Sequence, residues 1–219
     1  MCNEIMAYCL KYADTTLPKC QIFSDSTEET PQPITFSVYL IVTKDKKIMI
    51  DAGCDNMPRF VMRKFFSPAF VLRQVGWSAD EITDVVITHA HHDHMEAVRH
   101  FENATVHITE EAYENGRHFI PEGMRVHLIG EEYVLDEGIK MIKWAGHAAG
   151  SAIVEVAEGD KLHIFAGDEC YTTACLERRI ATGNSKNPEK SQAFVDIFSK
   201  EPYLVHTCHD WDLKTERLF

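Results

Sequence analysis

The sequence lacks several features that would assign it to other classes of protein. No apolar run approaches the roughly 20 residues that a membrane-spanning helix needs. The amino terminus has no basic segment followed by an apolar one, so we expect no signal peptide. Basic residues are scarce, with 22 lysines and arginines against 34 acidic residues and a formal charge of −12. Because phosphate backbones repel such a chain, we expect no nucleic-acid partner. Without a spanning segment, we also expect no membrane partner.

The cysteines do not show the pattern of a disulfide framework or of a cysteine metal site. Seven are present, an odd number, and no two form a Cys-x-x-Cys spacing. We therefore expect reduced, buried thiols and a cytoplasmic location. The chain has 219 residues, of which 45% are apolar and 26% are charged. This length and composition suit one domain with a well-buried core.

The most informative stretch holds four histidines and one aspartate within the six residues from His89 to His94. The β-branched run before it, residues 84–87, predicts a buried strand, and residues 95–101 after it predict the start of an amphipathic helix. We therefore expect the cluster on a loop at the carboxyl end of a strand, where α/β proteins place their sites. Imidazole and carboxylate are ligands that zinc and similar divalent metals select. His89 and His91 can share one metal, while Asp93 and His94 reach toward a second.

Other elements follow from local patterns. We expect an edge strand over residues 4–17, a loop or mobile flap over residues 24–33 and a hairpin of residues 34–43 and 47–51. Ser78 and Glu81 resemble a capping box before the strand that leads to the metal loop. Further strands are predicted at residues 105–109, 126–129, 133–135, 139–144, 152–157, 161–165 and 203–205, with helices at 110–115 and 188–199.

Residues 57–77 are crowded with large apolar side chains. We expect two short helices broken at Ser67-Pro68. Two interpretations stay open. The segment packs in the core and forms the contact of a homodimer, or it is an apolar wall beside the metals that receives the hydrocarbon part of a substrate.

The motif His89-x-His91-x-Asp93-His94 resembles the signature of the metallo-beta-lactamase superfamily. Three further motifs expected in that family occur in the same order, namely residues 146–151 (Gly-His-Ala-Ala-Gly-Ser), Gly167-Asp168 and His209-Asp210. The resemblance covers nearly the whole chain. It implies an α/β protein with the four-layer αβ/βα sandwich of this family, formed by residues 1–219 as a single domain with the metals at one edge.

The resemblance also implies two divalent metal ions, zinc first, with manganese, iron or cobalt as alternatives. The implied ligands are His89, His91 and His147 for metal 1, Asp93, His94 and His209 for metal 2, and Asp168 as the bridge between them. His206 competes with His209 for the late position, but only His209 is followed by the aspartate of the motif. His92 is the variable residue of the first motif and is expected to point away. The other histidines, His100, His107, His118, His127 and His163, match no ligand position.

Two more residues receive roles from the resemblance. Asp51, at the end of a predicted strand, is expected to fix a ligand histidine through a hydrogen bond, or else only to cap the turn. Tyr171, three residues after Asp168, resembles a tyrosine of the N-acyl-homoserine lactonase branch and is implied to donate to the developing oxyanion, or else only to pack at the start of a helix. Glu96-Ala97 departs from that branch, in which many members carry small residues at both positions.

The implied function is that of a dinuclear metal-dependent hydrolase. Redox di-iron members of the family usually replace the histidine at position 91 with glutamate, so His91 favours hydrolysis with zinc. The implied reaction opens a lactone or related ester by attack of a metal-bridging hydroxide, on a small substrate with an acyl or apolar part. Asp93 is the implied proton carrier. The alternatives are a thioester hydrolase of the glyoxalase II type, disfavoured because little chain follows His209, and a non-catalytic metal-binding member of the family.

Overall fold

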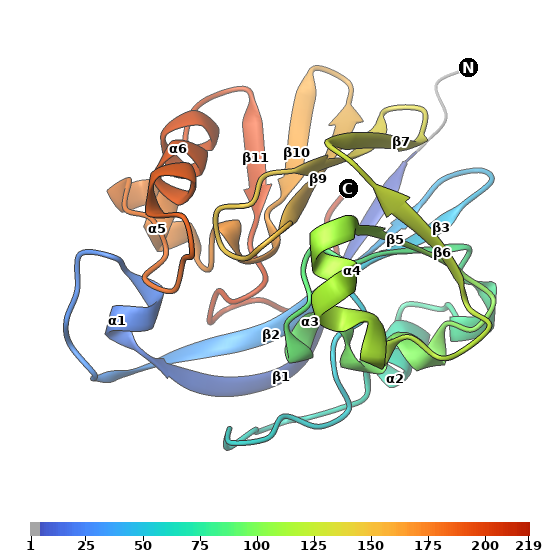
Figure 1. The fold of residues 1–219 in the computed structure, drawn as a ribbon, viewed down its shortest axis with the longest axis horizontal. Helices are drawn as coiled ribbons and strands as arrows, with labels where there is room; N and C mark the ends of the chain where they lie inside the picture. Colours follow the sequence, from blue (N-terminus) through green and yellow to red (C-terminus); the bar gives the residue numbers. More distant parts are fainter. Residues whose placement is uncertain (1–4) are drawn as a thin grey trace.

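Two β-sheets pack face to face in the middle of the molecule, and helices lie on their outer sides (Figure 1). The structure is a computed structural model that describes residues 5–219. The arrangement confirms the predicted four-layer αβ/βα sandwich. Within the described residues, no helix combines the length and the apolar character required to cross a bilayer.

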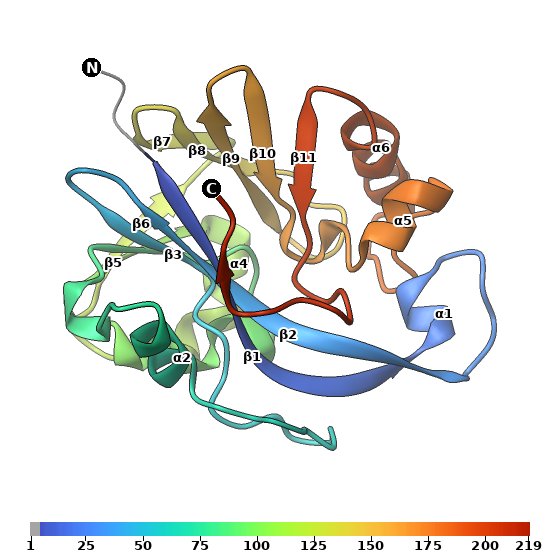
Figure 2. The same cartoon turned by 180° about the vertical axis from the view of Figure 1, so that it is seen from behind.

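The larger sheet has seven strands in the order β12-β1-β2-β3-β4-β5-β6. Strands β1 and β2 form a long antiparallel ribbon, whereas β3 to β6 run parallel to one another. Seen from behind, the C-terminal segment lies beside β1 (Figure 2). The strand bounds are β1 Met6–Pro18, β2 Pro31–Val42, β3 Lys47–Ile50, β4 Asp84–Val86, β5 Thr105–Thr109, β6 Arg125–Ile129 and β12 Glu216–Arg217.

The smaller sheet has five strands in the order β11-β10-β9-β8-β7, with only the pair β10 and β11 parallel. Its strand bounds are β7 Glu132–Asp136, β8 Ile139–Lys143, β9 Ala152–Glu158, β10 Lys161–Phe165 and β11 Tyr203–His206. The α-helices are α1 Lys19–Ile22, α2 Pro68–Gln74, α3 His92–Met95, α4 Glu110–Gly116, α5 Thr173–Arg178 and α6 Pro188–Phe198. The 3-10 helices are η1 Ala79–Glu81, η2 Glu96–His100, η3 Arg117–Phe119 and η4 Gly167–Glu169.

The core lies on both faces of the sheets, which explains why β2 reads as an almost continuous apolar run. Because successive side chains of a strand point to opposite faces, Tyr39 and Ile41 pack between the two sheets while Leu40 packs on the helix-covered side. On the outer side of the smaller sheet, Phe194 and Phe198 of α6 belong to the same buried cluster as Ile164 of β10. Both sheets are therefore held between apolar layers.

Three expectations need correction. Strand β1 is not a free edge, because β12 pairs with it at two positions, and residue 4 of the predicted strand lies outside the described residues. Strand β2 already begins at Pro31, inside the predicted loop, because the fixed φ of proline suits an extended backbone at a strand end. Only the second of the two helices predicted within residues 57–77 forms, since Arg59 and Lys64 have positive φ values of 75° and 47° that a helix does not accept.

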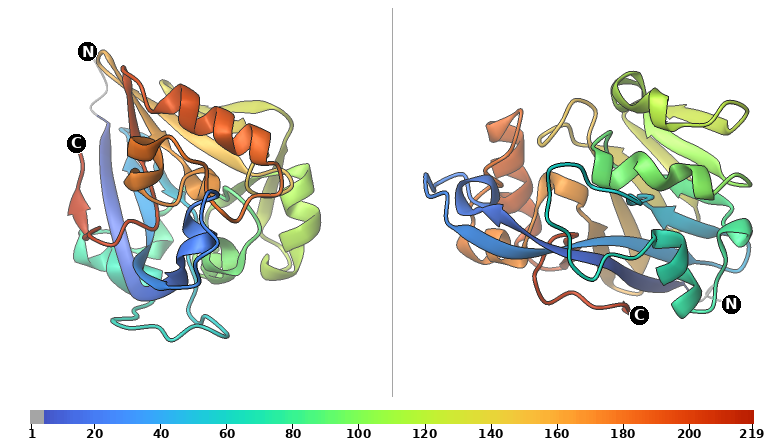
Figure 3. Two further views of the ribbon diagram at one scale, coloured as in Figure 1. Left: turned by 90° about the vertical axis from the view of Figure 1, so that its left-hand side faces the viewer. Right: turned by 90° about the horizontal axis from the view of Figure 1, so that it is seen from below.

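The ribbon of β1 and β2 extends past the rest of the sheet and carries α1 at its end (Figure 3). There the amide of Ser24 donates to the carbonyl of Ala181, and the amide of Gly183 donates to the carbonyl of Ile22. The ribbon end is thereby tied to the segment before α6. The predicted capping box is confirmed at Ser78 and Glu81, at the start of η1.

Candidate metal centre

Four loops bring the predicted ligands to one edge of the sandwich, and each loop follows the end of a strand. Residues 88–94 follow β4, residues 146–150 follow β8, residues 167–169 follow β10 and residues 207–209 follow β11. Gly167 has a φ of +51°, and a side chain there would come within 2.8 Å of the Thr88 hydroxyl. The first and third loops can therefore approach each other only because position 167 is glycine.

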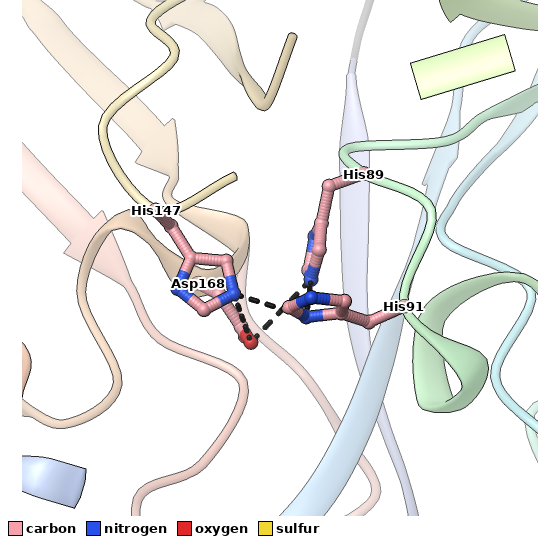
Figure 4. Close-up of side chains that lie close together, drawn as sticks. All are labelled: His89, His91, His147 and Asp168. Carbon is pink, nitrogen blue, oxygen red and sulfur yellow. Dashed lines mark hydrogen bonds and ion pairs between the residues drawn. The ribbon is translucent and has the colours of Figure 1, made fainter. Parts of the chain in front are cut away.

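The first cluster consists of three histidines and one aspartate (Figure 4). Nδ1 of His91 lies 2.9 Å from Nε2 of His89 and 3.0 Å from Nε2 of His147. Oδ2 of Asp168 lies 3.5 Å from Nε2 of His89 and 3.3 Å from Nε2 of His147. Four donor atoms from three loops thus converge on one point.

The second cluster lies on the other side of the same aspartate. Oδ1 of Asp168 is 3.1 Å from Nε2 of both His94 and His209. Oδ2 of Asp93 is 3.4 Å from Nε2 of His94 and 3.8 Å from Nε2 of His209. One oxygen of Asp168 therefore faces each cluster, which is the arrangement of a bridging carboxylate.

The donor atoms of the two clusters are better placed to bind a pair of divalent metals than to form hydrogen bonds with one another. Nε2 of His94 is buried and lies 3.1 Å from Oδ1 of Asp168, but it makes no hydrogen bond of good geometry within residues 5–219, and a buried nitrogen without a hydrogen bond is costly. In the first cluster one nitrogen, Nδ1 of His91, faces two other imidazole nitrogens, although one atom carries at most a single proton. A tetrahedral zinc at 2.0–2.1 Å from each would hold these nitrogens about 3.3 Å apart, close to the spacing observed.

Hydrogen bonds outside the clusters orient the ligands. Asp51 is buried, and its carboxylate accepts from the amide of Thr88 at 2.7 Å. Nδ1 of His94 lies 2.7 Å from Oδ2 of the same carboxylate, which directs Nε2 into the second cluster. Nδ1 of His209 is held in the same way by the carbonyl of Thr35 at 2.8 Å. The expected hydrogen bond between Asp51 and a predicted ligand is therefore present.

The glycine-flanked turn that carries His147 rests on a buried carboxylate. Glu169 is fully buried, and it accepts hydrogen bonds from the amides of Gly146 at 3.1 Å and His147 at 3.0 Å, and from the hydroxyl of Ser151. A side chain at position 146 would meet Oε2 of Glu169 at 2.3 Å. This close approach therefore favours glycine at position 146. Glu169 supports the turn that carries His147, a role that the sequence did not indicate.

Burial shifts the pKa of the histidines in the first cluster downward. It lowers the pKa of His91, lowers that of His89 well below its usual value and lowers that of His147 to about 4. These imidazoles are neutral at pH 7, the form that binds a metal. Burial by itself would raise the pKa of Asp93 and Asp168. Attraction to the imidazoles of His94 and His209 in the second cluster, whose own pKa values lie well above the usual one, outweighs burial and holds both carboxyl pKa values below the usual range. Both carboxylates are therefore ionised.

A cavity of about 240 Å³ opens above the two clusters. The apolar part of its wall comes from the β1–β2 ribbon and from the irregular segment before α2, and consists of Leu17, Phe36, Met57 and Phe60. Residues 57–77 therefore do supply part of a wall beside the predicted metals, while Phe66 and Phe70 of the same segment are about half exposed and stack on each other. The cavity has an apolar side and a polar floor.

Tyr171 lies between the two clusters at the cavity wall. Its ring centroid is 5.6 Å from that of His147 and 5.1 Å from that of His209. Burial raises the pKa of the phenol well above its usual value, and the nearby carboxylates of Asp168 and Asp93 add to the effect. The phenol therefore keeps its proton at neutral pH and can act as a hydrogen-bond donor.

Six of the seven predicted ligands belong to the two groups of converging donor atoms, and Asp93 lies beside the second group, 3.4 Å from Nε2 of His94. The competing histidines lie elsewhere. His206 stacks on His163 with ring centroids 5.2 Å apart, away from both clusters. His92 borders the cavity, but its Nε2 pairs with the carbonyl of Asn56 at 2.9 Å. Cys208 joins the second cluster although sequence reasoning treated it as an ordinary buried thiol. Its position next to His209 was the only available signal.

Comparison with known proteins agrees with this geometry. A family model described as the metallo-beta-lactamase superfamily matches residues 36–171. The N-acyl homoserine lactonase AiiB of Agrobacterium fabrum is 24% identical, and the match covers 69% of this chain and 72% of AiiB. A solved N-acyl homoserine lactone hydrolase, with N-hexanoyl-L-homoserine bound at its catalytic metal center, has a TM-score of 0.81 at 17% identity and covers 94% of this chain and 93% of its own. The dizinc quorum-quenching lactonase AidC has a TM-score of 0.75 at 16% identity and covers 94% and 87%.

Proposed function

The chain belongs to the metallo-beta-lactamase superfamily, and we propose that it is a dinuclear metal-dependent hydrolase that opens a lactone or related ester. The observation that carries the proposal is the position of Asp168, with one carboxylate oxygen directed at each of two ligand clusters. We infer N-acyl homoserine lactones as the first substrates to test, because that is what the names of its relatives specify.

Two divalent metals, with zinc first and manganese, iron or cobalt as alternatives, suit the donor set of imidazoles and carboxylates. In the proposed assignment His89, His91 and His147 would hold one metal, Asp93, His94 and His209 would hold the other, and Asp168 would offer one oxygen to each. When bound, such a pair supplies Lewis-acid polarisation of a carbonyl and lowers the pKa of a water to near neutrality.

The remaining steps fall to side chains of the chain itself. The apolar wall of the cavity, including Phe36 and Phe60, receives the hydrocarbon part of the substrate and leaves its ester group over the polar floor. The protonated phenol of Tyr171 donates a hydrogen bond to the carbonyl oxygen, on which negative charge grows. Asp93 is ionised and borders the cavity, so its carboxylate takes the proton that the attacking water loses as the new C–O bond forms, and passes it to the leaving alkoxide as the ester C–O bond breaks.

We also propose that the protein acts in the cytoplasm as a reduced protein. All six cysteines within residues 5–219 are free thiols, and five of them are buried. Unpaired cysteines in this number suit a reducing compartment.

The test is a substrate panel with defined metals. Metal-free protein is reconstituted with zinc, manganese, iron(II) or cobalt, and each form is assayed on N-acyl homoserine lactones, simple lactones, thioesters, phosphodiesters and β-lactams. We expect the highest kcat/KM on a lactone. A clear preference for thioesters would replace the lactonase with the glyoxalase II type of reaction. Two bound metals without turnover on any substrate would support a non-catalytic metal-binding protein instead.

A further inference from the structure

The thiol of Cys208 has no place in the ligand assignment, yet it lies inside the second cluster. The side chain is almost fully buried. Its Sγ is 3.2 Å from Oδ1 of Asp168 and 3.3 Å from the carbonyl oxygen of Gly167. A buried thiol in contact with the shared carboxylate has two possible roles there, as a metal ligand or as a hydrogen-bond donor.

The surroundings of Cys208 favour the hydrogen-bond donor. The second cluster already offers four donor residues without it, enough for a four-coordinate metal. Nitrogens of His94 and His209 lie within 4.8 Å of Sγ, but both of its hydrogen bonds run to oxygen atoms, and the carbonyl of Gly167 can only accept one. A thiolate would face two electron-rich oxygens without a proton between them, whereas a thiol satisfies them. Of the two acceptors, the carboxylate carries charge and forms the stronger hydrogen bond.

The contact is made by the oxygen whose direction matters most. Oδ1 of Asp168 faces His94 and His209, while Oδ2 faces the first cluster. A carboxylate oxygen has two lone pairs, so one can bind a metal while the other accepts the S–H.

We propose that Cys208 is a positioning residue that donates its S–H to Oδ1 of Asp168 and so keeps this oxygen directed at the second metal. The inference rests on the proposed dinuclear site but not on any particular substrate. Outer hydrogen-bond partners of metal ligands typically contribute about 10–100-fold in metal affinity. The hydrogen bond of a thiol is weak, so we expect a value near the lower end of that range for Cys208.

The experiment compares the wild type with Cys208→Ala, which loses the donor, and Cys208→Ser, which keeps one. Cys175→Ala is the matched control, because this thiol is equally buried but contacts Thr172 and the carbonyl of Ile22, not a cluster residue. The dissociation constant of each zinc ion is measured by competition with a chromophoric chelator, and the far-UV circular dichroism verifies folding. The cobalt(II)-loaded proteins are then examined by absorption spectroscopy, because a cobalt–thiolate bond gives an intense charge-transfer band in the near ultraviolet.

We expect Cys208→Ala to weaken one of the two zinc ions about tenfold and leave the other unchanged, with Cys208→Ser within about threefold of the wild type. The Cys175→Ala control should bind both ions normally, and no protein should show the charge-transfer band. A band in the wild type that disappears in Cys208→Ser would overturn the inference and make the thiolate a ligand. Equal affinities in all four proteins would also overturn it. A wild type that binds no metal would refute the inference together with the proposed function, whereas two bound metals without hydrolysis would refute only the hydrolase.

Discussion

Replacement of Tyr171 by phenylalanine removes one hydroxyl from the wall of the proposed substrate cavity. Within residues 5–219, the only hydrogen bond to this hydroxyl comes from Nδ2 of Asn184 at 3.5 Å, at the limit of a real interaction. Asn184 is exposed to solvent, so the variant leaves no buried donor without a partner. We therefore expect Tyr171→Phe to fold normally and to keep its metals, since the phenol is not among the donor atoms of either cluster.

The expected loss is in catalysis, and its size follows from the role of the donor. Removal of a full oxyanion-hole donor costs about 3–4 kcal/mol in other enzymes. Here the metals of the proposed site share the developing charge, so one phenol should contribute less. We expect kcat/KM to fall about tenfold, which corresponds to about 1.4 kcal/mol. The loss should appear mainly in kcat, because the charge on the carbonyl oxygen develops only in the transition state.

The assay compares kcat/KM of the wild type and Tyr171→Phe on the best lactone of the panel, with metal content measured on the same samples. Asn184→Ala is the control, because it removes the neighbouring amide and leaves the phenol in place. An unchanged kcat/KM in Tyr171→Phe would refute the oxyanion role. Loss of metal in the same variant would show instead that the phenol supports the ligands, and the tenfold effect would need another explanation.

Three further predictions concern the metals and the turn that holds His147. Protein purified without chelator should contain about two equivalents of transition metal by elemental analysis, and a value reproducibly below one after reconstitution would contradict the dinuclear site. Asp168→Ala should lose both metals and all hydrolysis, whereas His92→Ala, whose ring bonds to a backbone carbonyl, should retain its metals; equal loss in both would mean that the ligand loop is assigned wrongly. Glu169→Gln replaces an acceptor of three hydrogen bonds with a group that also donates, which destabilises the turn. Because the change also removes a buried charge, we expect a net loss of only about 2 kcal/mol in unfolding free energy. Calorimetry should show a Tm roughly 4–8 °C lower. Ser151→Ala, which removes one of the three donors, should lose about half as much, and a Glu169→Gln variant as stable as the wild type would show that the carboxylate does not support the turn.

Local patterns were sufficient for most of the secondary structure. Strand β5 over Thr105–Thr109 and strand β10 over Lys161–Phe165 have the predicted bounds, because each combines a β-branched or apolar run with a clear start and stop. The failures have equally local causes. Helix α5 and strand β12 have too few residues to show a hydrophobic period. The helix predicted before Ser67 is prevented by left-handed backbone at Arg59 and Lys64, a conformation that these residue types do not indicate.

The amino-acid sequence by itself determined the family and the candidate ligands, because the spacing of His89, His91, Asp93 and His94 on one loop is a local property of the chain. Only the tertiary structure decided what surrounds those ligands. Asp51 meets His94 across 43 residues and Cys208 meets Asp168 across 40, contacts that exist because separate strands end at the same edge of the sandwich. No periodicity or motif in the sequence indicates which side chains meet at such an edge. Hydrogen bonds between distant loops depend on the packing of the whole fold, so the supporting groups of the site had to be found in space.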